Sequence, residues 1–276
     1  MGEFHLLYMM KHPGVLLILI CCFLFSNADA QNENWDTYMA KFGNKPGSVL
    51  VDMALIEKAP DKKYPYLVIT GPRALNCDAH GIPAKDEIDV LEDILNTTGN
   101  FITGVTAKAL AGTFTYNCER LNYYYVKDTA GIRNAIMRLY DRGYQNYSYA
   151  INMKYDPAWT TYRTFLYPDE DMLDWMENTK MITKMIESGD SLATRRAISF
   201  AFYFKTDTAM KAFENYAGVR GYKTANTVGV SNFPHAIKAS KNDYVKIDII
   251  LPMIRELKDE AKKHNGLYNG WEAKKN

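Results

Sequence analysis

Apolar residues in the first half of the chain recur at two spacings, one typical of strands and one typical of helices. Runs rich in Val, Leu, Ile and Tyr predict strands over residues 48–56 and 64–70, which we expect to pair as a hairpin. Residues 83–99 carry apolar side chains at helical spacing behind a proline and two acidic residues. They predict a helix that Gly99 ends.

The same alternation continues to residue 166. Asp128 or Thr129 is placed to cap a helix that ends at Gly143. Further extended segments are expected over residues 101–108, 112–119, 122–126, 147–153 and 160–165. Helices that alternate with antiparallel strands favour one sheet with helices on one side.

The second half shows a more regular order of elements. The turn at Tyr167 and Pro168, with the acidic residues that follow, indicates the start of a new domain. The expected elements are a helix over 169–187, a strand over 196–204, a helix begun by Thr206 and Asp207, strands over 222–230 and 233–239, and a helix over 246–264. With the extended tail, this order is close to the split βαβ, or ferredoxin-like, arrangement. We therefore predict an α+β protein of two small α/β sandwich domains with antiparallel sheets, over residues 31–166 and 167–276.

Residues 1–30 have the layout of a signal peptide. Lys11 precedes an apolar run over residues 15–25, and the small residues Ala28 and Ala30 follow it. The run is about half the ~20 residues that a spanning helix needs, so we expect no membrane span once the signal is removed. Cleavage after Ala30 is favoured over lipidation at Cys21, because Leu19 and Ile20 precede that cysteine instead of small residues. The protein is thus expected to be periplasmic or secreted.

Charge and composition exclude several function classes. Thirty-three Lys and Arg residues against thirty-two Asp and Glu residues give a net charge of +1, so we expect no nucleic acid partner. The chain is 47% hydrophobic and 24% charged, which is typical of a globular protein with a buried core. Glycine-rich phosphate loops and paired zinc ligands are missing from the sequence, so we predict no cofactor, no metal and no catalytic residue set.

Signal removal would leave two cysteines, Cys77 and Cys118, in a compartment where thiols tend to be oxidised. A disulfide between them would close a loop of about forty residues and stabilise the fold by roughly 4 kcal/mol in the chain-entropy model. Two buried, unpaired thiols are the alternative that the sequence leaves open.

Two stretches of sequence resemble known families. The segment over 185–223 and the ending KKHNGLYNGWEAKKN resemble the regulator of ribonuclease E activity B family, over about residues 169–276, although that family usually has Asp where this chain has Asn269. The resemblance implies a small α/β sandwich that works by binding another protein. NWDTYMAKF, KPGSVLVDMAL and YPYLVITG are similar to the bacterial domain of unknown function numbered six-nine-five, which often precedes such a C-terminal domain. Because an exported protein does not meet a cytoplasmic ribonuclease, only the fold and the style of binding carry over.

The tail is the candidate partner-binding site. It combines an amphipathic Trp, a turn-forming Asn-Gly pair and a carboxylate in the segment Tyr268, Asn269, Gly270, Trp271 and Glu272. A terminal Trp that packs over a helix edge and locks the tail explains the same residues. Both interpretations stay open at this point.

Two alternatives involve the N-terminal domain. Cys77, Asp78 and His80 follow a strand end, where a hydrolase nucleophile or metal ligands could gather. Eleven Tyr and Trp residues crowd the stretch from Tyr123 to Tyr167, and exposed rings there would suit glycans. The favoured hypothesis remains an exported, non-enzymatic binding or regulatory protein of unknown partner, with a hydrolase or a glycan-binding module as the alternatives.

Overall fold

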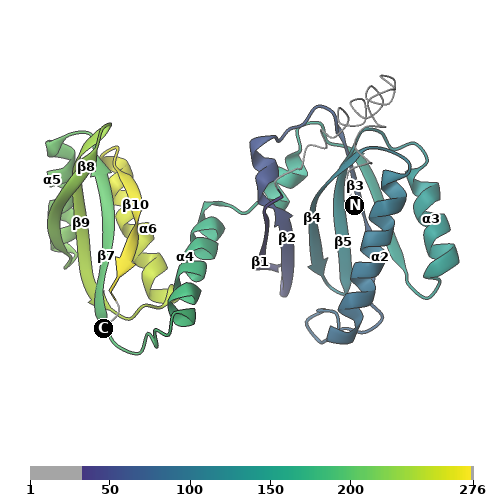
Figure 1. Cartoon of the computed structure of the whole chain (residues 1–276), viewed down its shortest axis with the longest axis horizontal. Helices are drawn as coiled ribbons and strands as arrows, with labels where there is room; N and C mark the ends of the chain where they lie inside the picture. The colour runs from purple at the N-terminus through teal and green to yellow at the C-terminus, as the bar shows by residue number, and fades with distance from the viewer. Residues whose placement is uncertain (1–32, 275–276) are drawn as a thin grey trace, which may run out of the picture. The chain divides into compact units, whose positions relative to one another are not determined.

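A computed structural model describes residues 33–274, which form two compact units that divide after Tyr167 (Figure 1). Both units are α+β, and each has its own antiparallel sheet. The predicted signal peptide lies outside the described residues. Within the described part of the chain, none of the helices has the length and apolar character needed to span a membrane.

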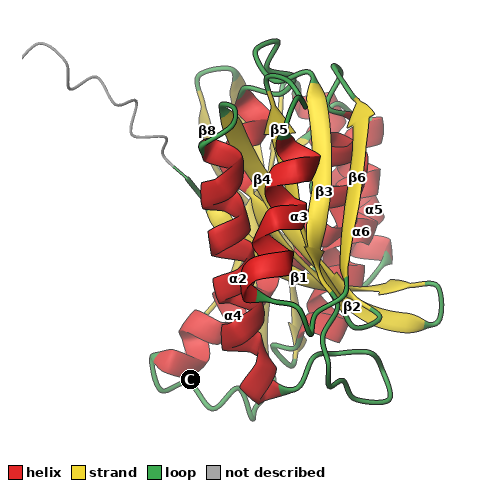
Figure 2. Cartoon of the chain, turned by 90° about the vertical axis from the view of Figure 1, so that its right-hand side faces the viewer, coloured by secondary structure: helices red, strands yellow, loops and turns green. Residues whose placement is uncertain are grey.

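The N-terminal unit is built on a six-stranded sheet with the strand order β1-β2-β4-β5-β3-β6. Its strands are β1 (Trp35–Phe42), β2 (Lys45–Asp52), β3 (Tyr66–Pro72), β4 (Lys108–Tyr116), β5 (Glu119–Val126) and β6 (Tyr149–Tyr155). Two helices, α2 (Lys85–Thr103) and α3 (Ile132–Gly143), lie together on one face (Figures 1 and 2). A 3-10 turn, η1 (Met53–Glu57), and a π-helical turn, η2 (Tyr162–Leu166), complete the unit.

Both faces of this sheet bury side chains, because residues of β5 alternate between two cores. Tyr124 and Val126 point to the helices and pack with Ile94 and Ile136. Tyr125 points to the other face, where its ring stacks on that of Trp159 at a centroid distance of 3.9 Å. Period-two alternation along one strand therefore supplies two apolar layers.

The C-terminal unit is a four-stranded sheet with the order β10-β7-β9-β8. Its elements are α4 (Glu170–Glu187), β7 (Arg196–Phe204), α5 (Asp207–Val219), β8 (Lys223–Val230), β9 (Phe233–Asp243), α6 (Ile247–Lys263) and β10 (Leu267–Ala273). From β7 onward the order βαββαβ, with the last strand beside the first, is the ferredoxin-like arrangement. Thr206 caps α5 by accepting a hydrogen bond from the Ala209 N–H at 3.2 Å, in agreement with the expected helix start.

Several local predictions for the N-terminal unit are wrong. The expected hairpin of residues 48–56 and 64–70 does not form, because β2 pairs with β1 and β4 while β3 pairs with β5 and β6. Gly99 does not end α2, which continues to Thr103 and so includes the first residues of the expected strand over 101–108. A Cβ at Gly99 would lie 3.1 Å from the Tyr124 hydroxyl, so this glycine permits close packing of the helix on the sheet.

Two further differences concern backbone N–H groups at helix starts. The N-cap of α3 is Gly131, at a φ of +76°, and neither Asp128 nor Thr129 caps the helix with its side chain. Residues 160–165 are helical instead of extended, because the buried Asp156 carboxylate accepts the N–H groups of Thr160 and Thr161 at 2.8 and 3.0 Å. A carboxylate that satisfies the first free N–H groups favours a helical turn over a strand.

Candidate functional site

The tail forms β10, an edge strand of the C-terminal sheet that pairs with β7. The register places Tyr268 opposite Phe202 and Glu272 opposite Ser199, and it shifts between Tyr268 and Trp271. Gly270 lies in this irregular stretch with a φ of +86°, a left-handed conformation that glycine adopts without steric cost. The Asn-Gly pair of the tail therefore makes a bulge within an edge strand.

One face of this sheet is covered by helices, and the other is partly exposed. The aromatic side chains of β7 at Phe200, Phe202 and Phe204 are fully buried in the core with residues of α5 and α6. The alternate side chains of β7 point to the opposite face and are only half-buried: Ser199, Ala201 and Tyr203. We call this second surface the open face.

A hollow of about 470 Å³ lies at the open face beside β10, and we call it the tail hollow. The tail contributes Asn269, Gly270, Trp271 and Glu272, which are four of the five residues predicted as partner-binding. Further lining residues are Ser199, Ala201, Tyr203, Thr227 and Lys238. The structure thus brings the tail together with side chains of three other strands.

Polar contacts hold the rim of the tail hollow in place. The Lys238 ammonium and the Glu272 carboxylate form an ion pair at 2.5 Å, and both side chains are partly exposed. The Asn269 amide donates a hydrogen bond to the Tyr203 hydroxyl at 3.0 Å. The rim therefore presents one cation, one anion, an amide and a phenol close together.

The remaining tail residues belong to the core. Trp271 is buried, and its indole N–H donates to the Asn178 side chain of α4 at 2.5 Å. Tyr268 is half-buried with its ring near Phe202, and burial raises the pKa of its phenol. Trp271 and Tyr268 anchor the strand, so the exposed polar groups of the tail are those of Asn269 and Glu272.

A buried ion pair fixes the start of β7 next to the tail. Arg196 donates two hydrogen bonds to the Asp190 carboxylate, at 2.5 and 2.9 Å, and the hydrogen-bonded carboxylate raises the pKa of the guanidinium. Arg196 also donates to the backbone carbonyl of Lys274 at 3.4 Å, beyond the end of β10. Asp190 is part of the turn on which the resemblance in the second half of the sequence rests.

Sequence reasoning missed Tyr203, Thr227 and Lys238 as site residues. The alternation of buried and half-buried residues along β7 and β9 places Tyr203 and Lys238 on the face opposite the core, whereas β8, with Thr227, is exposed along most of its length. That alternation shows which side chains face away from the core, but it does not show which strand lies beside which. The strand order was needed to gather them at the tail.

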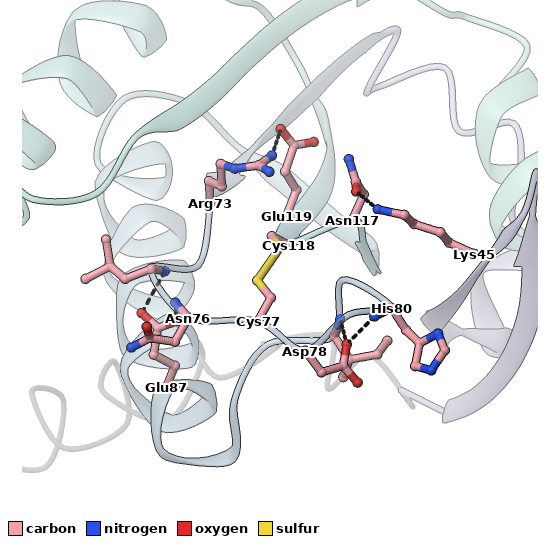
Figure 3. The surroundings of a disulfide bond; sticks show 12 residues. Lys45, Arg73, Asn76, Cys77, Asp78, His80, Glu87, Asn117, Cys118 and Glu119 are labelled. Atoms are coloured by element: carbon pink, nitrogen blue, oxygen red, sulfur yellow. Dashed lines mark hydrogen bonds and ion pairs between the residues drawn. A yellow bond between two sulfur atoms is a disulfide. The ribbon is translucent and has the colours of Figure 1, made fainter.

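The loop around Cys77 contains a disulfide instead of a nucleophile. Cys77 is bonded to Cys118, which connects the loop before α2 to the β4–β5 turn, with a Cα–Cα distance of 5.9 Å (Figure 3). The His80 ring points away from the two sulfur atoms. A sulfur held in a disulfide offers no thiolate, so the structure contradicts the hydrolase alternative.

The rest of this loop is held by polar contacts. The Asp78 carboxylate accepts the N–H groups of Ile82 and His80 at 2.8 and 2.9 Å, and these bonds lower the pKa of Asp78 (Figure 3). The Glu87 carboxylate accepts the N–H groups of Leu75 and Asn76. In the described residues, His, Cys, Asp and Glu side chains do not gather in a group of three that could hold a metal ion.

The crowded aromatic residues are mainly core residues. Six of the rings are buried: Tyr123, Tyr124, Tyr125, Tyr140, Trp159 and Tyr162. The segment from residue 156 to 167 covers the sheet face that could otherwise have remained open, as the contact between the Tyr123 and Phe165 rings shows. The other rings of the stretch are half-buried or exposed, and glycan binding by them stays a prediction.

Family comparisons confirm both resemblances. Residues 33–167 match a family of unknown function, DUF695, and residues 175–273 match the family described as Regulator of ribonuclease activity B. No curated protein matches the chain. Among solved structures, an unknown protein from Galdieria sulphuraria matches at 9% identity with a TM-score of 0.21, covering 76% of this chain and 98% of that one.

Proposed function

We propose that this chain is an exported regulatory protein that acts by binding another protein at the tail hollow, with no chemistry of its own. The C-terminal match to a family of ribonuclease regulators supports a regulatory, protein-binding role. The observation that carries the proposal is the meeting of four tail residues with Tyr203 and Lys238 around one hollow on the open face.

The shape and chemistry of the tail hollow suit a segment of a protein partner. The half-buried Tyr203 offers apolar contact area, and an amide and an ion pair at the rim offer directional hydrogen bonds. Interfaces commonly combine aromatic anchors with a polar rim of this kind. The paired rim charges favour a polar partner segment without strong charge of either sign.

Export is supported by the apolar run over residues 15–25 and by the disulfide between Cys77 and Cys118. Disulfides persist in oxidising compartments and are rare where thiol reductants are abundant. The partner would then be a protein of the envelope or the surroundings of the cell, and a ribonuclease of the cytoplasm would not be the target.

Site-specific photo-crosslinking tests the binding surface. A photo-reactive phenylalanine replaces Asn269 at the rim of the hollow, and a matched variant carries it at Lys211, which is exposed on α5. We expect a discrete adduct from position 269 in envelope extract and none from position 211. An excess of unlabelled protein should compete, whereas the same excess of Ala201→Trp, in which the hollow is filled, should not.

Equal adducts from both positions, or equal competition by the filled variant, would contradict the proposed surface. Export is tested separately by fractionation and mass spectrometry of the chain. The expected product begins at Gln31 and lies outside the cytoplasm. A chain that retains Met1 inside the cell would overturn export without affecting the crosslinking result.

A further inference from the structure

A second hollow, of about 460 Å³, lies in the N-terminal unit between α2 and the part of the sheet that α2 does not cover. Its floor is the helix-facing side of β2, β4 and β5, including Leu50, Thr113 and Asn122, which lie in one cross-strand row. Glu92 and Leu95 of α2 form one wall, and Trp35 is at the opposite side. The volume is within the range of small-molecule sites.

Lys108 supplies the charge in this hollow that has no direct counter-ion. It is half-buried at the start of β4, with its ammonium 5.1 Å from the Tyr124 ring centroid. Among residues 33–274, none accepts a hydrogen bond from the ammonium or forms an ion pair with it. Burial lowers the pKa of Lys108, and the negative charge of Glu33 opposes that effect.

The second cation of the hollow is already neutralised. Arg120 donates to Glu92 at 2.6 Å and to the Thr115 hydroxyl at 2.8 Å. An incoming anion would therefore pair with Lys108, while the two carboxylates of Glu33 and Glu92 would repel additional negative charge. This balance selects a monoanion over a phosphate dianion or a polyanion.

The floor offers fixed polar groups beside apolar surface. The Thr113 hydroxyl donates to the Asn122 side chain at 2.6 Å, and the Asn122 amide donates to the Tyr124 hydroxyl at 2.7 Å. Thr113 and Asn122 line the hollow, and their hydrogen bonds leave oxygen lone pairs and one amide hydrogen for a ligand. Trp35 and Leu50 are half-buried and provide apolar contact area.

From this arrangement we propose that the hollow binds a small organic monocarboxylate, with its carboxylate at the Lys108 ammonium and its apolar part against Trp35 and Leu50. A charge-assisted hydrogen bond to a partly desolvated ammonium provides the anchor. The apolar part replaces water over the two hydrophobic side chains. This ligand site is independent of the tail hollow and of the proposed protein partner.

Fluorine NMR on the full chain tests the proposal with para-trifluoromethylbenzoate and a terminally trifluorinated hexanoate. Each carboxylate is compared with its own neutral primary amide. We expect saturable shifts for at least one carboxylate and binding of its amide that is weaker by about tenfold or more, because the amide lacks the charge that pairs with Lys108. Lys108→Met should weaken carboxylate binding by a similar factor, whereas Lys154→Met on β6 should leave it unchanged.

A variant that binds the carboxylate more tightly provides a test that loss of folding cannot imitate, because an unfolded protein would only lose binding. Glu33 is exposed, and Glu33→Gln removes a repelling charge from the rim, so carboxylate binding should become about two- to threefold tighter at neutral pH. Leu50→Phe should fill the hollow and weaken binding. No saturable carboxylate binding, equal binding of carboxylate and amide, or unchanged binding in folded Lys108→Met would each overturn the proposal.

Discussion

The two units differ in how they cover their sheets. In the N-terminal unit, α2 and α3 pack on one face and the segment from Asp156 to Tyr167 covers much of the other. In the C-terminal unit, the helices bury one face and leave side chains of β7 and β9 half-exposed on the other. A sheet with one uncovered face keeps surface for a partner, whereas the N-terminal sheet keeps only the part that α2 does not cover, where the hollow with Lys108 lies.

Trp159→Ala should have the largest effect, and only on the N-terminal unit. The side chain is 1% exposed, stacks on Tyr125, and donates its indole N–H to the Tyr64 carbonyl at 3.0 Å. Truncation of such a residue costs about 3–5 kcal/mol of unfolding free energy. Hydrogen-exchange mass spectrometry resolves the two units, and Trp175→Ala, on the exposed side of α4, is the control expected to cost about 1 kcal/mol or less.

Arg196→Met should have a comparable effect on the C-terminal unit. It removes the guanidinium from the buried Asp190 carboxylate, which keeps its hydrogen bond from the Leu192 N–H, and breaking a buried pair in this way costs about 3–5 kcal/mol. Denaturant unfolding of Arg195→Met provides a neighbouring control, because the Arg195 side chain is 66% exposed. Equal stability of the two variants would contradict the anchoring role of the Asp190–Arg196 pair.

Replacement of both Cys77 and Cys118 by Ala should destabilise the N-terminal unit by about 2–4 kcal/mol, because the unfolded chain regains the freedom of the closed loop. Thermal unfolding with and without a reductant measures the effect. The reductant should lower the midpoint of the native chain and leave that of the double variant unchanged. Sensitivity of the double variant to reductant would show that another bond was responsible.

Asp156→Asn should reduce the loss of stability of the N-terminal unit in acid. Burial raises the pKa of Asp156, but hydrogen bonds from the Thr161 N–H, the Tyr125 hydroxyl and the Thr160 N–H outweigh it, so the net pKa is lowered. The stabilisation is then present above the unfolded pKa of about 3.9 and lost as the pH falls through the lower folded pKa. Unfolding midpoints between about pH 5 and pH 2 should fall less steeply in the variant, although it is less stable at neutral pH.

Lys238→Ala should have the smallest effect on stability. The Lys238–Glu272 pair is partly exposed, so its loss should change the unfolding free energy by about 1 kcal/mol or less. The same variant should nevertheless weaken crosslinking from position 269. Strong destabilisation would show that the rim pair is structural, and unchanged crosslinking would show that the rim cation does not contact the partner.

Local patterns predicted the C-terminal unit better than the N-terminal unit. The strand bounds of β7 and the Thr206 cap follow from short-range alternation and capping, and the structure agrees with both. In the N-terminal unit, the hairpin prediction failed because sequence neighbours β2 and β3 are separated in the sheet by β4 and β5. The prediction that Gly99 ends the helix failed for a similar reason. A glycine is placed there because the Tyr124 side chain, on a strand distant in sequence, leaves little room for a Cβ.

The sequence by itself determined the α+β class, the two family resemblances, the tail as a candidate site and the pair of cysteines. Each of these depends on residue type and on spacing within a short window, where local physical chemistry dominates. Only the tertiary structure decided that Trp271 lies inward beside Asn178, that Tyr203 and Lys238 join the tail, and that Lys108 lies in a hollow without a direct counter-ion. Those outcomes depend on which strands become neighbours in the sheet. Strand neighbours are selected by the burial of a whole sheet face, which no single segment of sequence determines.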